Sequence, residues 1–261
     1  MKTDKQQAYE QSGSDASARD KTSVVLIRHA QSQWNQENRF TGWADPPLTE
    51  SGIAEAHRAA EILCECGYQF DVAYSSRLQR AIRTLDILLA DMGQADIPRE
   101  TDWRLNERHY GALQGVDKAQ ATAQVGEQQV WRWRRGYHDK AAPLSRRDHS
   151  HPIHDKRYAD VHPLFLPDVE NLAETRDRVM RFWSEQMLPR LRKGERVLIS
   201  AHGNTLRALL MDLAGMSVAE VESFEIPTAT PIVYRFDQEA TPLDWNYLDT
   251  GNETTNIKHA M

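Results

Sequence analysis

The chain has 261 residues, of which 40% are hydrophobic and 27% charged, and its formal net charge is -6. This size suits one large α/β domain or two small ones, and the composition allows a buried core to form. A pI of about 5.9 and a mean hydropathy of -0.68 predict a soluble protein. They argue against general binding to nucleic acid or to an anionic membrane surface, which requires an excess of Lys and Arg. A local basic pocket remains compatible with this charge.

The two ends of the chain are polar. Residues 1–22 lack the apolar segment of a secretory signal and are predicted to be a disordered tail, and residues 249–261 are predicted to be a flexible one. Residues 23–248 are expected to form the folded domain, and no apolar run in the sequence is long enough to cross a bilayer. Cys64 and Cys66 are two residues apart, a spacing poorly suited to a disulfide, so both are predicted to be reduced.

Short apolar runs alternate with helical patterns along the chain. Residues 23–27 are rich in β-branched side chains and predict a buried strand, and residues 50–66 place apolar side chains at helical spacing. Ser75 or Ser76 is expected to cap the next helix, and Pro189 to end a later one. Further strands are predicted at 72–74, 196–201 and 232–236, and further helices at 78–92, 172–188 and 206–213. This alternation predicts a three-layer α/β fold, a mostly parallel sheet with helices on both faces.

Residues 106–170 interrupt this alternation. They are polar, rich in Arg, His and Pro, and too long for a plain connection, which favours a lid-like insertion with a functional role. The run Trp131–Arg135 fits the face of an amphipathic helix better than a nucleic-acid surface, given the acidic pI. His149, His151 and His154 lack the spacing and the cysteines of a zinc site, so no metal is predicted.

Cations and imidazoles follow three of the predicted strands. The first strand leads into Arg28 and His29, the second into Arg77 and Arg80, and the third into His202. Ligands of open α/β sheets bind beyond the carboxyl ends of the strands, so we expect these groups to meet at one rim. Guanidinium groups match phosphate oxygens, and the helix that begins near Asn204 adds unpaired backbone N–H groups. The pattern indicates a site for a dense anion.

Such a rim can support phosphoryl transfer. A neutral imidazole among cations can attack phosphorus and form a phosphohistidine, which divides one difficult transfer into two easier ones. The remaining requirements are positioning and positive charge around the phosphoryl oxygens. An acid must protonate the leaving oxygen, and Glu107 in LNERHYGALQG is the candidate, because a nearby phosphate favours the protonated carboxyl. Each residue alone also has an ordinary structural explanation, such as a helix cap for His202 or a solvated helix face for Arg80.

Four segments carry a family resemblance: LIRHAQSQWNQENRFTGW, RLNERHYGALQG, WRWRRGY and SAHGNTLRALL. They closely resemble the 2,3-bisphosphoglycerate-dependent phosphoglycerate mutases of the histidine phosphatase superfamily, over residues 22–245. The resemblance implies interconversion of 3-phosphoglycerate and 2-phosphoglycerate in glycolysis and gluconeogenesis, primed by 2,3-bisphosphoglycerate and without a metal. It also implies a cytoplasmic homodimer or homotetramer. A phosphatase or bisphosphoglycerate synthase on the same scaffold, or a non-catalytic phosphometabolite-binding protein, remain as alternatives.

The resemblance also implies roles for individual residues. His29 would carry the phosphoryl group, Glu107 would donate and accept the proton, and His202 would surround the phosphoryl group together with Arg28 and Arg80. The residues implied to bind the glycerate and its phosphates are Arg28, Ser32, Asn35, Thr41, Gly42, Arg80, Glu107, Arg108, His109, Tyr110, Lys118, Arg134, Arg135, Gly203 and Asn204.

Two positions depart from the family pattern. Ala30 and Gln31 stand where the family usually has Gly and Glu. Alanine would be disfavoured at this position if the backbone there required a positive φ. Loss of a carboxylate beside the phosphate would be expected to strengthen anion binding or to alter selectivity.

Overall fold

The computed structural model describes residues 22–248 of the chain. The predicted tails lie outside the described residues, except that Thr22 already belongs to the first strand. Within residues 22–248, no helix is long and apolar enough to span a membrane. Cys64 and Cys66 are free and exposed.

One six-stranded sheet forms the centre of the molecule, with the strand order β3-β2-β4-β1-β5-β6. Strands β1 to β4 pair in parallel, whereas β5 runs antiparallel to both of its neighbours, so the prediction of a mostly parallel sheet is confirmed. The sequence patterns missed β3 and β6, because β3 has three exposed residues and β6 has only two fully buried ones. The strands are β1 Thr22–Arg28, β2 Val72–Ser75, β3 Arg99–Thr101, β4 Val197–Ala201, β5 Pro231–Phe236 and β6 Pro242–Tyr247.

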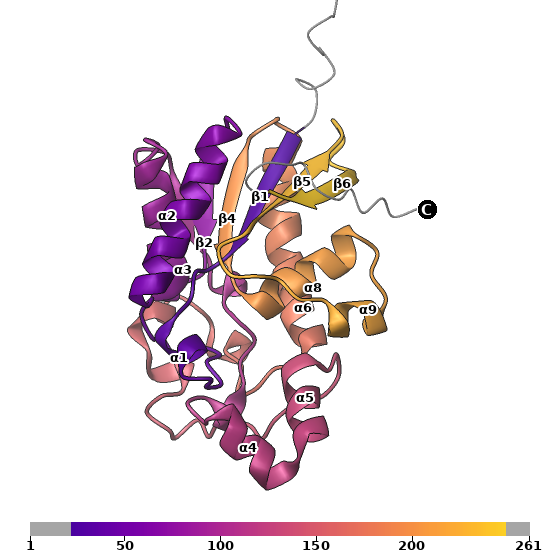
Figure 1. Ribbon diagram of the computed structural model, residues 1–261. Helices are drawn as coiled ribbons and strands as arrows, with labels where there is room; N and C mark the ends of the chain where they lie inside the picture. Colours follow the sequence, from indigo (N-terminus) through magenta and orange to yellow (C-terminus); the bar gives the residue numbers. More distant parts are fainter. Residues whose placement is uncertain (1–21, 249–261) are drawn as a thin grey trace, which may run out of the picture.

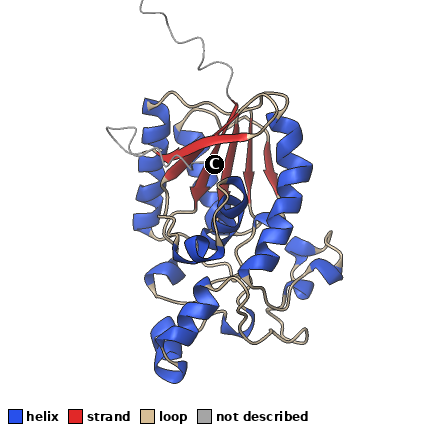
Figure 2. Ribbon diagram, turned by 90° about the vertical axis from the view of Figure 1, so that its right-hand side faces the viewer, coloured by secondary structure: helices blue, strands red, loops and turns tan. Residues whose placement is uncertain are grey.

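Helices cover both faces of the sheet (Figures 1 and 2). The side chains of β1 show why both faces need cover: Val24 and Leu26 belong to the core shared with α6 and α8, whereas Val25 and Ile27 belong to the core shared with α2 and α3. A strand buried on both faces is continuously apolar, which is the pattern that predicted β1. These four helices are α2 Glu50–Glu65, α3 Gln79–Asp91, α6 Leu172–Phe182 and α8 Gly203–Leu213.

Two predicted helix boundaries were wrong. The helix expected to end at Pro189 continues, since α6 is followed by a π-helical turn, Trp183–Met187, and then by α7, Leu188–Leu191. Pro189 lies in the first turn of α7, directly after the π-helical turn, and this local departure from α-helical geometry accommodates a residue that lacks an N–H group. Neither Ser75 nor Ser76 caps α3, whose N-cap residue is Leu78 without a side-chain cap.

The insertion at 106–170 is less irregular than predicted. It contains α4, Lys118–Val125, and α5, Glu127–Arg135, together with several short 3-10 helices. Figure 1 shows α4 and α5 beyond the end of the sheet at which β1 and β4 finish. The short helices α1, Gln33–Gln36, and α9, Val218–Ser223, lie near the same end. The insertion is therefore placed to cover the rim of the sheet.

Candidate active site

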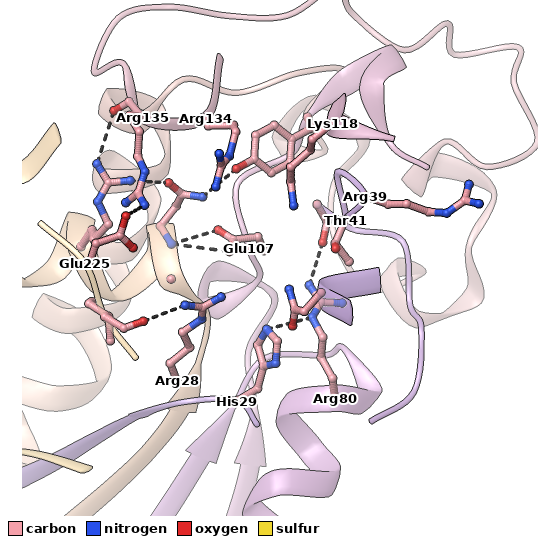
Figure 3. A pocket seen from close by; sticks show the side chains of 17 residues that line it. Arg28, His29, Arg39, Thr41, Arg80, Glu107, Lys118, Arg134, Arg135 and Glu225 are labelled. Atoms are coloured by element: carbon pink, nitrogen blue, oxygen red, sulfur yellow. Dashed lines mark hydrogen bonds and ion pairs between the residues drawn. The ribbon is translucent and has the colours of Figure 1, made fainter. Parts of the chain in front are cut away.

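A cavity of about 210 Å³ lies at the rim where β1 and β4 end (Figure 3). This is below the ~300–1,000 Å³ of pockets for drug-sized ligands, so it suits a small metabolite. Cationic and polar side chains dominate its walls. The lining residues are Arg28, His29, Asn35, Arg39, Thr41, Gly42, Arg80, Glu107, Tyr110, Lys118, Arg134, Arg135, Gly203, Asn204, Arg207, Glu225 and Ile226.

His29 follows β1 directly and is 3% exposed. Its Nδ1 lies 2.8 Å from the carbonyl oxygen of Ala30, so Nδ1 carries a proton and donates it to that carbonyl. The lone pair is then on Nε2, to which Arg80 Nε donates at 3.2 Å. Burial, with Arg80 and Arg28 nearby, holds the pKa of His29 well below its usual value. His29 is therefore a neutral imidazole with its free nitrogen facing a cation, the state that a nucleophile requires.

His202 is the N-cap residue of α8 and is fully buried. Its Nε2 lies 2.7 Å from Ser76 Oγ, and that hydroxyl already accepts a hydrogen bond from the N–H of Leu78. The single proton of the Ser76 hydroxyl has no other acceptor among the described residues, so Ser76 donates it to Nε2 and the proton of the imidazole lies on Nδ1. Nδ1 is buried and has no hydrogen-bond partner among the described residues, and the ring lies 4.9 Å from that of His29. Burial and the charge of Arg80 hold the pKa of His202 well below its usual value, so a neutral N–H donor is available beside His29.

Arg80 is held by backbone carbonyls. Nη1 donates to Ala44 and Nη2 to Gly42, each at 2.8 Å, and burial lowers the pKa of Arg80 to about 10, which leaves it charged at neutral pH. Gly42 has a φ of +54°, and a Cβ there would lie 2.3 Å from Gln114 Oε1, so this turn requires glycine. Arg28 is held from the opposite side, where its Nη1 donates to the carbonyl of Ile226 at 2.7 Å.

Glu107 reaches the cavity from the start of the insertion. Its Oε1 accepts from the backbone N–H of Arg108 at 2.8 Å and from that of Asn204, in the first turn of α8, at 3.2 Å. Asn204 Nδ2 in turn donates to the hydroxyl of Tyr110 at 3.1 Å. The carboxyl group is thus positioned by backbone donors and faces the same cavity as His29.

Three cations from α4 and α5 complete the wall, namely Lys118, Arg134 and Arg135. Figure 3 shows Lys118 and Arg134 on the opposite side of the cavity from His29. Burial, helped by Arg134 and Arg28, lowers the pKa of Lys118 to about 8. Burial also lowers the pKa of Arg135. Burial is the main cause of both shifts and the neighbouring cations add to it, a combination that is expected of an enclosed anion site.

Most of the predicted binding residues therefore line one cavity, but Ser32, Arg108 and His109 do not. Ser32 caps α1 and contacts Asn35 Oδ1 through its hydroxyl and its N–H. Arg108 donates to the carbonyls of Gly136 and Arg134 and so fixes the end of α5. These two residues position lining groups.

His109 and Arg77 lie further from the predicted site. His109 is buried, accepts from the N–H of Gly111 at 3.0 Å and packs against Trp43. Arg77, expected at the rim, forms a two-pronged ion pair with Asp160 in the insertion. Arg77 therefore anchors the insertion and does not line the cavity.

Sequence reasoning missed Ser76 and four lining residues, Arg39, Arg207, Glu225 and Ile226. Arg207 had a detectable signal, since it follows Asn204 by three residues and so shares its helix face. Its Nη1 donates to Asn204 Oδ1 at 2.8 Å. Glu225 belongs to no sequence motif. It reaches the cavity only through the packing of the segment that follows α9.

The two departures from the family pattern fit the fold. Among residues 22–248, the non-glycine residues with a positive φ are Asn38, Ala229 and Ala240, so the backbone of Ala30 is not in the left-handed region. Gln31 does not line the cavity, and its Oε1 accepts from the hydroxyls of Thr49 and Ser51 at 2.9 and 2.7 Å. The described residues contain no group of three or more His, Cys, Asp or Glu side chains that could hold a metal ion.

Comparison with known proteins gives the family. The model of the histidine phosphatase superfamily (branch 1) matches residues 24–146 and 145–247. The chain belongs to this superfamily. Its fold is that of the histidine phosphatases.

Solved structures with similar folds include both kinds of enzyme. The alpha-ribazole phosphatase of Shigella flexneri is 21% identical, with 91% of this chain and 100% of that one covered and a TM-score of 0.63. A mycobacterial glucosyl-3-phosphoglycerate phosphatase is 23% identical, with coverages of 87% and 97% and a TM-score of 0.61. The phosphoglycerate mutase of Bacillus anthracis is 18% identical, with coverages of 91% and 96% and a TM-score of 0.61. At these identities the likeness establishes the shared fold.

Proposed function

We propose that the protein is a phosphoglycerate mutase that interconverts 3-phosphoglycerate and 2-phosphoglycerate and is primed by 2,3-bisphosphoglycerate. One observation carries the proposal: Lys118, Arg134 and Arg135 line the same cavity as His29. A mutase must hold a second anionic group of the glycerate while the first reacts, and this wall supplies separate cations for that purpose. Enclosure by the insertion also limits the access of water to a phosphohistidine, which favours transfer to the glycerate.

The reaction follows from the positions of the side chains. Priming leaves a phosphoryl group on His29 Nε2. The 2-hydroxyl of 3-phosphoglycerate gives its proton to the Glu107 carboxylate and attacks phosphorus, so that a P–O bond forms as the P–N bond breaks. The bound bisphosphate then turns within the cavity. Nε2 attacks its 3-phosphoryl group, Glu107 returns the proton to the leaving oxygen, and 2-phosphoglycerate departs from a regenerated phosphohistidine.

The cations and N–H donors act on the charge of the transferring group. Arg28 and Arg80 flank His29, and the protonated Nδ1 of His202 lies beside it. The first turn of α8 adds backbone N–H groups and the positive end of the helix dipole. Fixed donors of this kind stabilise the transition state without reorganisation during the reaction.

A phosphatase is the second candidate, and the similar structures favour it, since they include an alpha-ribazole phosphatase and a glucosyl-3-phosphoglycerate phosphatase. The two activities share the phosphohistidine and differ in the acceptor, which is the glycerate in one and water in the other. Assembly into a dimer or tetramer and a cytoplasmic location, both implied by the family resemblance, stay predictions.

The deciding experiment offers the purified protein 3-phosphoglycerate with and without a catalytic amount of 2,3-bisphosphoglycerate. We expect 2-phosphoglycerate as the main product and a strong stimulation by the bisphosphate. Free phosphate as the main product would show a phosphatase. No product of either kind would show a binding protein.

A further inference from the structure

Glu225 is a carboxylate in a cavity lined mainly by cations. Seven Lys and Arg side chains line this cavity against two carboxylates, Glu107 and Glu225. Glu107 is held by backbone N–H groups and has a role in proton transfer. Glu225 instead forms an ion pair with Arg135, one of the cations proposed to hold the glycerate (Figure 3). Glu225 is therefore paired with a cation that the proposed substrate needs.

Hydrogen bonds fix the backbone around Glu225, whereas its side chain is largely exposed. Arg135 Nη1 donates to the carbonyl of Phe224 at 3.2 Å, Arg28 Nη1 to that of Ile226 at 2.7 Å, and the Tyr247 hydroxyl to that of Glu225 at 3.3 Å. The side chain of Glu225 is 69% exposed, against 14% for Arg135. An exposed carboxylate can turn into water at little cost, since exposed ion pairs are weak. The buried guanidinium stays in place to receive another anion.

We propose that Glu225 is a specificity-determining residue that competes with the ligand for Arg135 and yields only to a multiply charged anion. The proposal rests on the proposed function in one respect, the choice of a phosphorylated glycerate as the ligand. A single phosphate bound between His29 and Arg80 does not need Arg135. A ligand with a second or third anionic group must displace Glu225, so its binding is weakened by the like charge. Glu225 thus lowers the affinity for the most highly charged ligands.

The test measures binding in the absence of chemistry. Isothermal titration in the His29→Ala background compares Glu225→Gln with its parent, using inorganic phosphate, 3-phosphoglycerate and 2,3-bisphosphoglycerate at a fixed ionic strength near 0.1 M. Glu185→Gln is the matched control. It removes one charge from the Arg104–Glu185 pair, whose side chains are 14% and 60% exposed and do not line the cavity. Circular dichroism confirms that each variant is folded, and 3-phosphoglycerate binding is repeated with His29 intact.

We expect Glu225→Gln to tighten 2,3-bisphosphoglycerate about tenfold, 3-phosphoglycerate about threefold and inorganic phosphate less than about twofold. Glu185→Gln should change none of the three. An unchanged or weaker affinity for the bisphosphate, an equal gain for inorganic phosphate, or an equal gain in Glu185→Gln would each overturn the proposal. Failure of the mutase proposal would appear separately, as free phosphate or no product in the turnover assay of the unaltered enzyme.

Discussion

The floor and the wall of the cavity are built in different ways. The floor consists of Arg28, His29 and Arg80, which line the cavity, together with His202, which does not line it but whose ring lies 4.9 Å from that of His29. All four lie where strands end or helices begin at one end of the sheet. The two histidines and Arg80 are at most 3% exposed, and backbone groups or buried side chains fix their orientation. The wall consists of Lys118, Arg134 and Arg135 from the insertion and of Glu225 from the segment after α9. Its ion pair between Arg135 and Glu225 includes a largely exposed carboxylate.

The floor and the wall are expected to determine two different properties of the enzyme, namely phosphoryl transfer and the choice of ligand. In the proposed reaction the floor forms and consumes a phosphohistidine whatever the rest of the ligand is, because it contacts only the transferring group. In the same reaction the wall determines which anion is held and how much water reaches the phosphohistidine. Phosphatases and a mutase with similar folds are therefore expected to share the floor and to differ in the wall.

The largest expected effect is on the floor. His29→Ala removes the nucleophile, so we expect turnover to fall by at least about a thousandfold, in the range found when a nucleophile is deleted. Incubation with 2,3-bisphosphoglycerate labelled in its phosphates should leave no acid-labile label on this variant, in contrast to the unaltered protein. Label that persists at the same level would show that another residue carries the phosphoryl group.

Glu107→Gln tests the proton donor, which lies between floor and wall. The amide oxygen can still accept the N–H groups of Arg108 and Asn204, so the fold should be retained. The loss of general acid–base catalysis should lower kcat by about 10²–10⁴-fold, with KM within about threefold of its original value. Steady-state kinetics with 3-phosphoglycerate measure both parameters. Near-normal kcat would remove Glu107 from this role.

The floor could be predicted from the sequence better than the wall. Arg28 and His29 follow an apolar run that is unmistakably a buried strand, and parallel strands bring their carboxyl ends to one rim. Pro189 misled the prediction, because a local helix-breaking signal gives no information about the π-helical turn that precedes it. Glu225 and Ser76 could not be found in this way, since their positions depend on tertiary packing between segments distant in sequence.

A pH dependence is expected from the wall. The pKa of Lys118 is lowered to about 8, mainly by burial, so this side chain loses its positive charge as the pH rises through that value. The anionic substrate then binds less well, and KM for 3-phosphoglycerate should rise about five- to tenfold between pH 7 and pH 9. Lys118→Arg keeps a charge over this range and should flatten the rise. An equal rise in the arginine variant would assign the effect to another group.

The smallest expected effect concerns Ala30, next to the nucleophile on the floor. Its N–H donates to Thr84 Oγ1 at 3.1 Å, its carbonyl accepts from His29 Nδ1, and its methyl group is fully buried in the core shared with α2 and α3. Ala30→Gly keeps both backbone hydrogen bonds, so kcat should stay within about twofold. Loss of the methyl burial and greater freedom of the unfolded chain should lower the free energy of unfolding by about 1–2 kcal/mol.

Urea denaturation of the two proteins measures this difference, and the kinetics are compared on the same preparations. Because Ala30 does not have a positive φ, glycine brings no conformational relief at this position. A more stable Ala30→Gly protein would contradict this account of the backbone. A large fall in kcat at unchanged KM would show instead that the rigidity of the Ala30 backbone is needed to orient His29. Ala30 would then act on catalysis although its side chain does not line the cavity.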